Sequence, residues 1–376
     1  MISTDLRQSR LCLKHVWPRL SLFETRTAVI VQLLNSLKAW VKGQPAYYAA
    51  RRRLVELSTR HIAGPTASAS AEDALVVVCL VRNGELFVRS FIEHYIALGA
   101  RQIVLLVNRP SDQTVEIARR YQQVSILRCD LPFKRFQFDM REAMVRRYSR
   151  RGWVLYADID EHFYYPHADR LPIRELLRYL NQHGYTAVVA QMLDMFSGDA
   201  LQAHRSSVDD RLADFYQFYD LSAIEKYEYS SRYTGKNTAS NPAIKIHMGG
   251  IRKLLFGAEC LLIKHPLMLM TPDMVAFDGT THDIRNARVA DFSCVLLHYK
   301  FISALPEQTV SAIQEGQYWQ GSAEYRLYHK VLEHSPNLSI RQPSSLQLRS
   351  ADDLIDQGFM VVSPAYEDWV RREQQG

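Results

Sequence analysis

The sequence has 376 residues, of which 47% are hydrophobic and 23% charged, and this balance excludes disorder over most of its length. Positive charge is concentrated at the start: residues 1–62 carry 11 lysines and arginines against 3 acidic residues, whereas the rest of the chain carries 35 against 37. The near-neutral body excludes a basic nucleic-acid-binding protein, and no nucleic-acid partner is expected.

Residues 1–70 are predicted to form a basic helical extension that ends in a linker. Between Thr27 and Val41, apolar residues recur at helical spacing beside lysines and arginines. Such a helix either packs on the main domain or lies on an anionic membrane surface. No secretory signal is recognised, and the scattered cysteines lack a CxxC pair, which favours a reducing compartment. We therefore expect a cytoplasmic protein, with peripheral attachment to the inner face of the cell membrane through residues 1–62 as the membrane alternative.

Strands and helices alternate in the next part of the chain. Buried strands are predicted at 75–81, 103–107, 124–129 and 153–157. Strands that alternate with helices of about 10–15 residues indicate a parallel sheet with right-handed crossovers. In such a sheet, ligands bind at the carboxyl ends of the strands. Residues 71–301 are therefore predicted to form an α/β domain, and residues 302–376 a mainly helical C-terminal segment.

An acidic motif follows the fourth of these strands, in WVLYADIDEHF. Asp158 and Asp160 are one residue apart, and Glu161 follows directly. Carboxylates in this arrangement suit a hard divalent cation, which would neutralise a nucleotide diphosphate and improve it as a leaving group. His298 and Lys300 follow another predicted strand, which should end on the same side of the sheet. The structural alternatives are a solvated strand end for the aspartates and a core position for His298.

From about Leu75 to Phe301 the chain resembles glycosyltransferases of the family 2 type with the GT-A fold, in particular a bacterial branch. The matching stretches are VRNGELFVRSFIEHYIALGA, WVLYADIDEHF, MLDMF, GGIRKLLFG, KHPLM, TTHDI and LLHYKF. The resemblance implies a transferase that moves a sugar from a nucleotide-diphosphate sugar to a hydroxyl of a glycan, polysaccharide or lipid-linked saccharide. It implies an inverting reaction with Mn²⁺ or Mg²⁺ as cofactor.

The resemblance also implies which residues bind the donor and the metal. The donor contacts are Arg82, Asn83, Glu85, Asn108, Asp112 and Asp158. The metal ligands that it implies are Asp158 and Asp160. His298, at the end of its predicted strand, is a further candidate for contact with the metal or the diphosphate. The run LLVNRPSDQT departs from the family, because Val107 stands where an aspartate is common and Pro110 where a serine is common. A uridine nucleotide is therefore not implied.

The residues that would act in the transfer itself are less clearly indicated. An inverting transfer needs a carboxylate that accepts the proton of the acceptor hydroxyl. Asp194, Asp278 and Asp283 are candidates that spacing does not separate, and Asp283 is favoured because TTHDI belongs to a segment shared with the family. Lys300 is expected to stabilise charge on the departing diphosphate. Arg252 is a candidate for binding a phosphate or an anionic acceptor.

Two other functions compete with glycosyl transfer. A non-catalytic nucleotide-sugar or glycan-binding protein would keep the fold, although the retained acidic motif argues against it. A phosphatase with a nucleophilic aspartate is disfavoured, because its Asp-x-Asp normally ends the first strand and continues into Thr or Val. The aromatic run FYQFYD, Phe215 to Asp220, suits either stacking on sugar rings or a place in the core.

Overall fold

The structure is a computed structural model, and it describes residues 45–66, 74–150, 152–229, 236–277, 279–316 and 319–375. The chain divides into two compact units, Met1–Arg51 and Arg52–Gly376. Only the beginning of helix α2 (Pro45–Ser58) represents the first unit among the described residues. The helix predicted between Thr27 and Val41 lies outside them, so its membrane attachment stays a prediction. Among the described residues, no helix is both long enough and apolar enough to cross a membrane.

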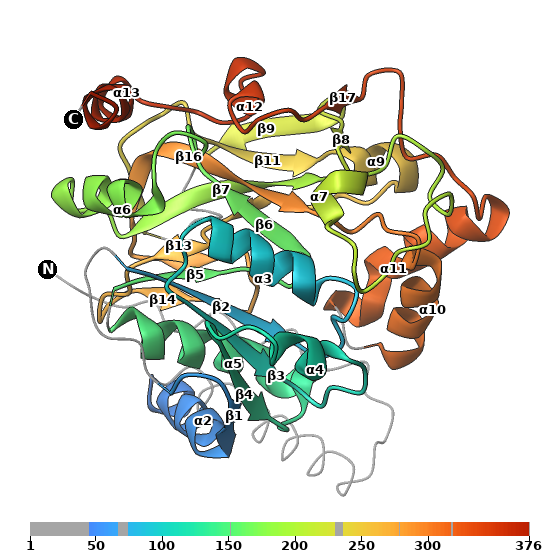
Figure 1. Cartoon of the computed structure of the whole chain (residues 1–376), viewed down its shortest axis with the longest axis horizontal. Helices are drawn as coiled ribbons and strands as arrows, with labels where there is room; N and C mark the ends of the chain where they lie inside the picture. Colours follow the sequence, from blue (N-terminus) through green and yellow to red (C-terminus); the bar gives the residue numbers. More distant parts are fainter. Residues whose placement is uncertain are drawn as a thin grey trace, which may run out of the picture. The chain divides into compact units, whose positions relative to one another are not determined.

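The larger unit is built on a sheet that, within the described residues, has 11 strands (Figure 1). Nine of them follow the order β1-β4-β3-β2-β5-β13-β7-β16-β10, while β6 pairs with β16 and β12 with β7. The strands are β1 (Thr59–Ala63), β2 (Leu75–Val81), β3 (Gln102–Val107), β4 (Val124–Cys129), β5 (Trp153–Tyr156), β6 (Glu161–Tyr164), β7 (Ala187–Asp194), β10 (Thr238–Ala239), β12 (Ile263–Lys264), β13 (Leu267–Met268) and β16 (Arg288–His298). The predicted α/β class with a mostly parallel sheet is confirmed.

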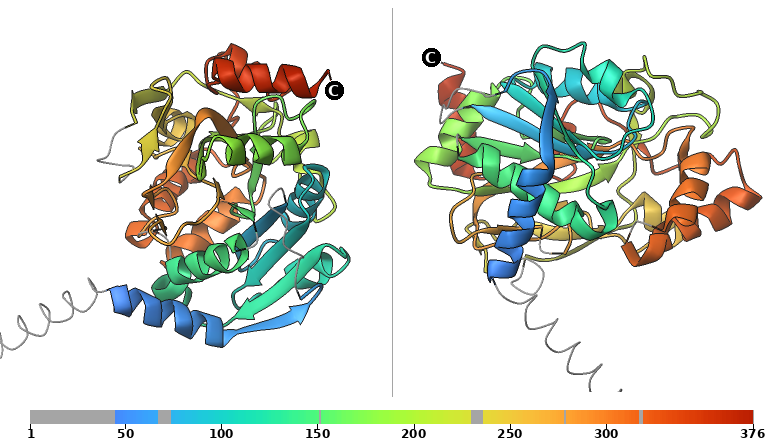
Figure 2. Two further views of the ribbon diagram at one scale, coloured as in Figure 1. Left: turned by 90° about the vertical axis from the view of Figure 1, so that its left-hand side faces the viewer. Right: turned by 90° about the horizontal axis from the view of Figure 1, so that it is seen from below.

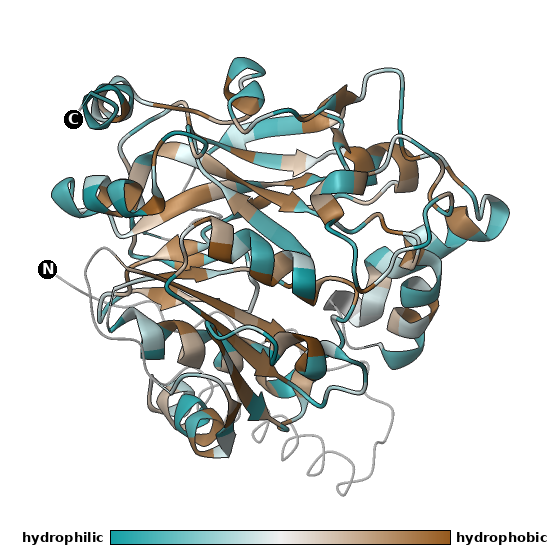
Figure 3. Ribbon diagram, in the orientation of Figure 1, coloured by the Kyte–Doolittle hydropathy of each residue, from teal (hydrophilic) through white to brown (hydrophobic). Residues whose placement is uncertain are grey.

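Helices cover both faces of this sheet (Figure 2). In β2, Val77 and Cys79 pack among side chains of α3 and α6, whereas Val76 and Val78 pack against α5. Figure 3 shows the apolar residues gathered in the central strands, as expected for strands buried on both faces. The helices are α3 (Val88–Ala97), α4 (Thr114–Ala118), α5 (Phe133–Ser149), α6 (Ile173–Gln182), α7 (Leu212–Phe215), α9 (Ile251–Phe256), α10 (Leu305–Glu315), α11 (Trp319–His334), α12 (Asp353–Asp356) and α13 (Pro364–Glu373).

In the part of the chain that the structure describes, short strands outside the main sheet form three two-stranded pairs. They are β8 (Phe218–Tyr219) with β17 (Leu346–Gln347), β9 (Ile224–Glu228) with β11 (Lys245–Gly249), and β14 (Val275–Ala276) with β15 (Ile284–Arg285). In the aromatic run, Tyr216 and Tyr219 are buried in a hydrophobic cluster, so these two rings belong to the core. Cys79, Cys129, Cys260 and Cys294 are free thiols, and Cys79, Cys129 and Cys294 are buried.

The strand directions bring several carboxyl ends to one edge of the sheet. Strand β13 is antiparallel to both β5 and β7, and β16 is parallel to β7, so β5, β7 and β16 run in the same direction. Strand β6 returns antiparallel beside β16, with Glu161 opposite His298. The register of β7 places Asp194 opposite the same histidine. The prediction that His298 ends on the same side as Asp160 is confirmed.

Two histidine rings stack beneath this edge. The rings of His94 (α3) and His162 (β6) lie 4.4 Å apart with 3° between their planes. Burial lowers the pKa of His94 to about 4, and burial with the nearby His94 lowers the pKa of His162 well below its ordinary value. In the unfolded chain both rings take up a proton near pH 6.5. Unfolding therefore binds protons between about pH 6.5 and pH 4, and stability falls as the pH is lowered through that window.

We expect His162→Phe to reduce this loss of stability in acid. A phenyl ring occupies similar space beside Tyr299, whose ring lies 4.7 Å from that of His162, but it does not titrate. The drop in melting temperature between about pH 7 and about pH 5 should be smaller in the variant than in the parent. Thermal unfolding at both pH values measures it, with the exposed His61→Gln as control. An unchanged pH dependence in His162→Phe would show that the pair does not govern acid stability.

Candidate active site

The acidic motif forms the turn between β5 and β6. The backbone N–H of Glu161 donates to the carbonyl oxygen of Asp158 at 3.0 Å. In return, the backbone N–H of Asp158 donates to Oε2 of Glu161 at 3.0 Å. These two bonds close the turn and leave the Asp160 side chain at its apex. The side chain of Glu161, only 1% exposed, therefore contributes to the shape of the turn.

Asp158 lies in a buried network of donors. Lys264 Nζ, from β12, lies 2.8 Å from Asp158 Oδ2 and 2.5 Å from Glu161 Oε1. The Tyr156 hydroxyl donates to Asp158 Oδ1 at 2.7 Å and accepts a hydrogen bond from Arg141 Nε at 2.6 Å. Burial by itself raises the pKa of Asp158, but the charges of Lys264 and Arg141 outweigh it and hold this pKa well below its usual range. Asp158 is therefore ionised, and both of its oxygens accept hydrogen bonds from the protein.

Asp160 faces His298 across the edge of the sheet. Asp160 Oδ2 lies 3.3 Å from His298 Nε2, and His298 Nδ1 lies 2.6 Å from Asp194 Oδ1. Burial by itself lowers the pKa of His298, but the carboxylates of Asp160 and Asp194 outweigh it and raise the pKa to about 9. At neutral pH the imidazole is therefore positively charged and held between two carboxylates.

The alternation of charge continues into the C-terminal helices. Arg252 Nε, from α9, donates to Asp194 Oδ2 at 2.8 Å, and its Nη1 donates to Glu324 Oε1, from α11, at 3.2 Å. Lys300 Nζ is 3.8 Å from the same Glu324 oxygen and lies over two tyrosine rings of α11. Burial by itself lowers the pKa of Lys300, but Glu324 outweighs it and raises the pKa well above its usual value. A continuous series of ion pairs thus connects the Asp160 pair to Lys300.

Asp160 and His298 are the residues that fit a metal ion best. Within the described residues, no group of three or more His, Cys, Asp or Glu is arranged to hold a metal. These two facing residues nevertheless suit a cation whose remaining ligands come from a bound diphosphate, and metal binding would displace the proton from His298 Nε2. Asp194 supports His298 through the opposite ring nitrogen, which is the usual support of a metal-binding histidine. An oxygen and an imidazole nitrogen together favour Mn²⁺ over Mg²⁺.

The loops after β2 and β3 hold the residues predicted to bind the nucleotide. Asn83 Oδ1 accepts from the backbone N–H of Ser111 at 3.0 Å. Asp112 Oδ2 accepts from the N–H of Glu85 at 2.9 Å, so the two loops are joined. Arg82 Nη1 donates to Glu315 Oε2, at the end of α10, at 2.8 Å.

Asn108, directly after the end of β3, is more buried than these loop residues. It is 2% exposed, and its Nδ2 donates to the carbonyl oxygens of Cys129 and Leu131 at 2.7 and 2.9 Å. These bonds connect the ends of β3 and β4. The Asn108 amide nitrogen is thus engaged by backbone carbonyls, and its predicted contact with the nucleotide stays a prediction.

Two of the three candidate bases lie within the described residues, in different surroundings. Asp194 is 5% exposed, and both of its oxygens accept hydrogen bonds from His298 and Arg252. Asp283 lies at the β14–β15 hairpin, where Arg285 Nε is 3.6 Å from its Oδ2. Asp278 lies outside the described residues. The hairpin borders the site, because His282, next to Asp283, bonds through Nδ1 to the carbonyl oxygen of Ile263 at 2.8 Å, directly before Lys264 in the chain.

Sequence reasoning missed Lys264, Arg141 and Glu324. Lys264 belongs to KHPLM, which matches the family, but a lysine in an apolar run gave no role by itself. Arg141 is one basic residue among several in α5, and Glu324 lies in a helix without a motif. One weak signal was available for Lys264. A lysine within an apolar, strand-like run is rarely buried without a carboxylate partner, so its position indicated such a partner without identifying it.

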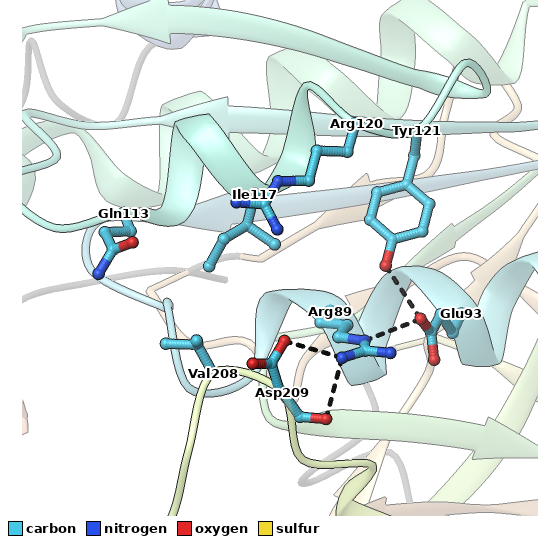
Figure 4. Close-up of a pocket in the computed structure, with 8 residues that line it drawn as sticks. All are labelled: Arg89, Glu93, Gln113, Ile117, Arg120, Tyr121, Val208 and Asp209. Atoms are coloured by element: carbon cyan, nitrogen blue, oxygen red, sulfur yellow. Dashed lines mark hydrogen bonds and ion pairs between the residues drawn. The ribbon is translucent and has the colours of Figure 1, made fainter.

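A separate pocket opens between α3 and α4 (Figure 4). It has a volume of about 370 Å³, and none of the predicted donor or metal residues lines it. Three of its four charged side chains pair with one another: Arg89 binds Glu93 at 3.0 Å and Asp209 at 2.9 Å, and the Tyr121 hydroxyl donates to Glu93 at 3.0 Å. Arg120 also lines the pocket, and Figure 4 shows no pair between it and the other lining residues.

Comparison with known proteins identifies no family. No known family model matches the sequence, and no curated protein matches it. A mannosyltransferase from Pyrobaculum calidifontis, in complex with GDP-Man and Mn²⁺, aligns over 41% of this chain and 45% of its own, with 16% identity and a TM-score of 0.24. A mycobacterial protein aligns over 67% of this chain and 78% of its own, with 13% identity and a TM-score of 0.27. This chain thus spans less than half of that mannosyltransferase, and scores this low establish neither a common fold nor a common function.

Proposed function

We propose that this protein is a metal-dependent glycosyltransferase that moves a sugar from a nucleotide-diphosphate sugar to a hydroxyl of a saccharide acceptor. The observation that supports it most is the approach of Asp160 to His298, 3.3 Å apart, at the carboxyl edge of a parallel α/β sheet. The two residues are far apart in the sequence, and Asp194 orients the histidine from behind. Ligand sites of parallel sheets lie at this edge.

In this proposal each charged group has a separate task. A divalent cation held by Asp160 and His298 would supply Lewis-acid neutralisation of the diphosphate. Arg252 and Lys300 offer positive charge to the leaving diphosphate, where charge develops during transfer. Asp194 acts as an orienting group, because both of its oxygens are engaged. The acceptor's proton then goes to Asp283 or Asp278, the candidates that remain from the sequence analysis.

The charges of the site make metal and nucleotide binding interdependent. The carboxylates of the site are Asp158, Asp160, Glu161, Asp194 and Glu324, and its cations are Arg141, Arg252, Lys264, His298 and Lys300. These charges balance when no ligand is bound. A divalent cation alone, or a diphosphate alone, would disturb this balance inside a partly buried site. A cation that displaces the proton of His298 adds one net positive charge, which the negative charge of a bound diphosphate offsets.

We therefore expect Mn²⁺ and a nucleoside diphosphate to increase each other's affinity by about tenfold or more, a reciprocal coupling. Calorimetric titration of GDP and of UDP, each with and without Mn²⁺, measures the coupling. In a thermal-shift assay, a ligand at roughly 100 times its Kd stabilises the fold by about 2.7 kcal/mol. Equal nucleotide affinity with and without Mn²⁺ would contradict metal dependence.

Turnover separates the enzyme from a non-catalytic binding protein of the same fold. Release of nucleoside diphosphate from a nucleotide sugar, in the presence of saccharide acceptors, is the direct assay. A protein that binds the donor with Mn²⁺ and releases no diphosphate with any acceptor or water would be the binding protein. A phosphatase is disfavoured further by the geometry, because Lys264 and Tyr156 occupy the oxygens that a nucleophilic Asp158 would need.

A further inference from the structure

Helices α10 and α11 bring two glutamates to cations of the candidate site. Glu315, the last residue of α10, accepts a hydrogen bond from Arg82 Nη1 at 2.8 Å. Glu324 of α11 accepts from Arg252 Nη1 at 3.2 Å and lies 3.8 Å from Lys300 Nζ. Figure 1 shows both helices beside the edge at which β2 and β3 end. The C-terminal part of the chain therefore supplies counter-charges to the side chains that are proposed to bind an anionic donor.

The two arginines remain incompletely satisfied by these glutamates. Arg252 is 4% exposed, and its buried Nη2 has no hydrogen-bond partner within the described residues. Arg82 likewise has a buried Nε without a partner in the described part of the chain. A buried donor without a partner is costly, and a guanidinium is well suited to bind phosphate through two N–H groups at once. Each arginine thus pairs with one glutamate, Arg252 also pairs with Asp194, and each keeps one buried donor without a partner among the described residues.

Glu324 itself is held firmly in the ionised form. Burial by itself raises its pKa, but Lys300 and Arg252 outweigh the burial and hold the pKa well below its usual range. The Tyr328 hydroxyl also donates to its Oε1. A carboxylate that stays ionised between two cations occupies the place that the oxygen of a phosphate would take.

We propose that Glu324, assisted by Glu315, is an internal substitute for the anionic part of the donor, and that a diphosphate must displace it in order to bind. This inference rests on the proposed function and adds a self-inhibitory contact to the same site. In the ligand-free protein the glutamates neutralise Arg82, Arg252 and Lys300. When a diphosphate takes over these cations, Glu324 is released, so the hairpin of α10 and α11 responds to donor binding.

The test is the affinity for inorganic pyrophosphate in a metal-free buffer, measured by calorimetry. Without metal, the titration reports the cations and not the Asp160–His298 pair. We expect Glu324→Gln to bind pyrophosphate about tenfold more tightly than the parent, because one competing charge is gone. Glu315→Gln should tighten binding less, since its ion pair is more exposed, with side-chain exposures of 38% and 37% for Arg82 and Glu315.

Matched controls are available on the same two helices. Glu333 on α11 and Glu307 on α10 are exposed glutamates, and Glu333→Gln and Glu307→Gln remove the same charge away from the cations. Glu324→Gln should also melt at a lower temperature without ligand, because Arg252 and Lys300 lose their shared carboxylate.

The outcomes separate this inference from the proposed function. If Glu324→Gln binds pyrophosphate no more tightly than Glu333→Gln, or if no protein binds it, the displacement is wrong. If Glu315→Gln alone tightens binding, Glu324 is a structural residue and the proposal fails for α11. If pyrophosphate binds as expected but nucleotide sugars show neither Mn²⁺-dependent binding nor turnover, the displacement stands and glycosyl transfer is wrong.

Discussion

Asp160→Asn should abolish Mn²⁺-dependent nucleotide binding and turnover while the protein remains folded. The asparagine keeps the shape of the side chain and can still accept a hydrogen bond from His298, but it lacks the charge that a hard cation requires. Loss of a supporting group behind a metal ligand costs about 10–100-fold in affinity or activity, and loss of a direct ligand should exceed that range. Calorimetry with Mn²⁺ and GDP, together with diphosphate release, measures both effects.

Two comparisons make this result interpretable. Asp169→Asn removes the same charge from an exposed position nine residues later and should leave binding unchanged. His298→Asn should weaken Mn²⁺-dependent binding in the same way as Asp160→Asn, because both residues belong to one pair. If Asp160→Asn binds nucleotide with Mn²⁺ as tightly as the parent, the acidic turn is only structural and the proposed site is wrong.

Lys264→Met should have the largest effect on stability. Lys264 is 4% exposed and neutralises Asp158 and Glu161, which otherwise share a buried turn as neighbouring like charges. Removing one partner of a buried ion pair leaves an uncompensated buried charge and typically costs about 3–5 kcal/mol. Chemical denaturation followed by circular dichroism gives the free energy of unfolding, and the melting temperature should fall with it.

The chain offers a matched control for this substitution. Lys245 pairs with Glu228 across β9 and β11 at 2.7 Å, but the two side chains are 30% and 79% exposed. Lys245→Met should therefore cost less than about 1 kcal/mol. Adding Glu161→Gln to Lys264→Met should recover part of the lost stability, because it removes one uncompensated charge. Equal costs for Lys264→Met and Lys245→Met would show that the buried network does not stabilise the turn.

The main elements of the sheet were predictable because their signals are local. The buried strand from Leu75 and the one before Asp158 are short apolar runs with turns at their ends, and β2 and β5 appear where those runs lie. Parallel strands end at the same edge, so the sequence predicted that His298 and Asp160 lie on the same side of the sheet. Their close approach also depends on the pairing of β6 with β16, which was not predicted. The helix predicted between Thr27 and Val41 lies outside the described residues and stays a prediction.

The partners of the predicted residues were not predictable in the same way. Lys264 pairs with Asp158 across 106 positions, and Arg252 pairs with Glu324 across 72. Both lysine and glutamate are most often solvated surface residues, so sequence gave no reason to bury either of them. Asn108 and Asp112 show the converse: their residue types suited a ligand, yet Asn108 bonds to neighbouring backbone and Asp112 to the backbone of Glu85.

By itself, the sequence determined the α/β class, the order of the central strands along the chain and the edge at which Asp158, Asp160 and His298 gather. These follow from hydrophobic period and from the common direction of parallel strands, which are properties of short segments. Only the tertiary structure decided which charges neutralise which: Lys264 binds Asp158, and Glu324 lies between Arg252 and Lys300. The physical reason is that ion pairing inside a fold depends on distance and burial, and neither is encoded in the spacing of residues along the chain.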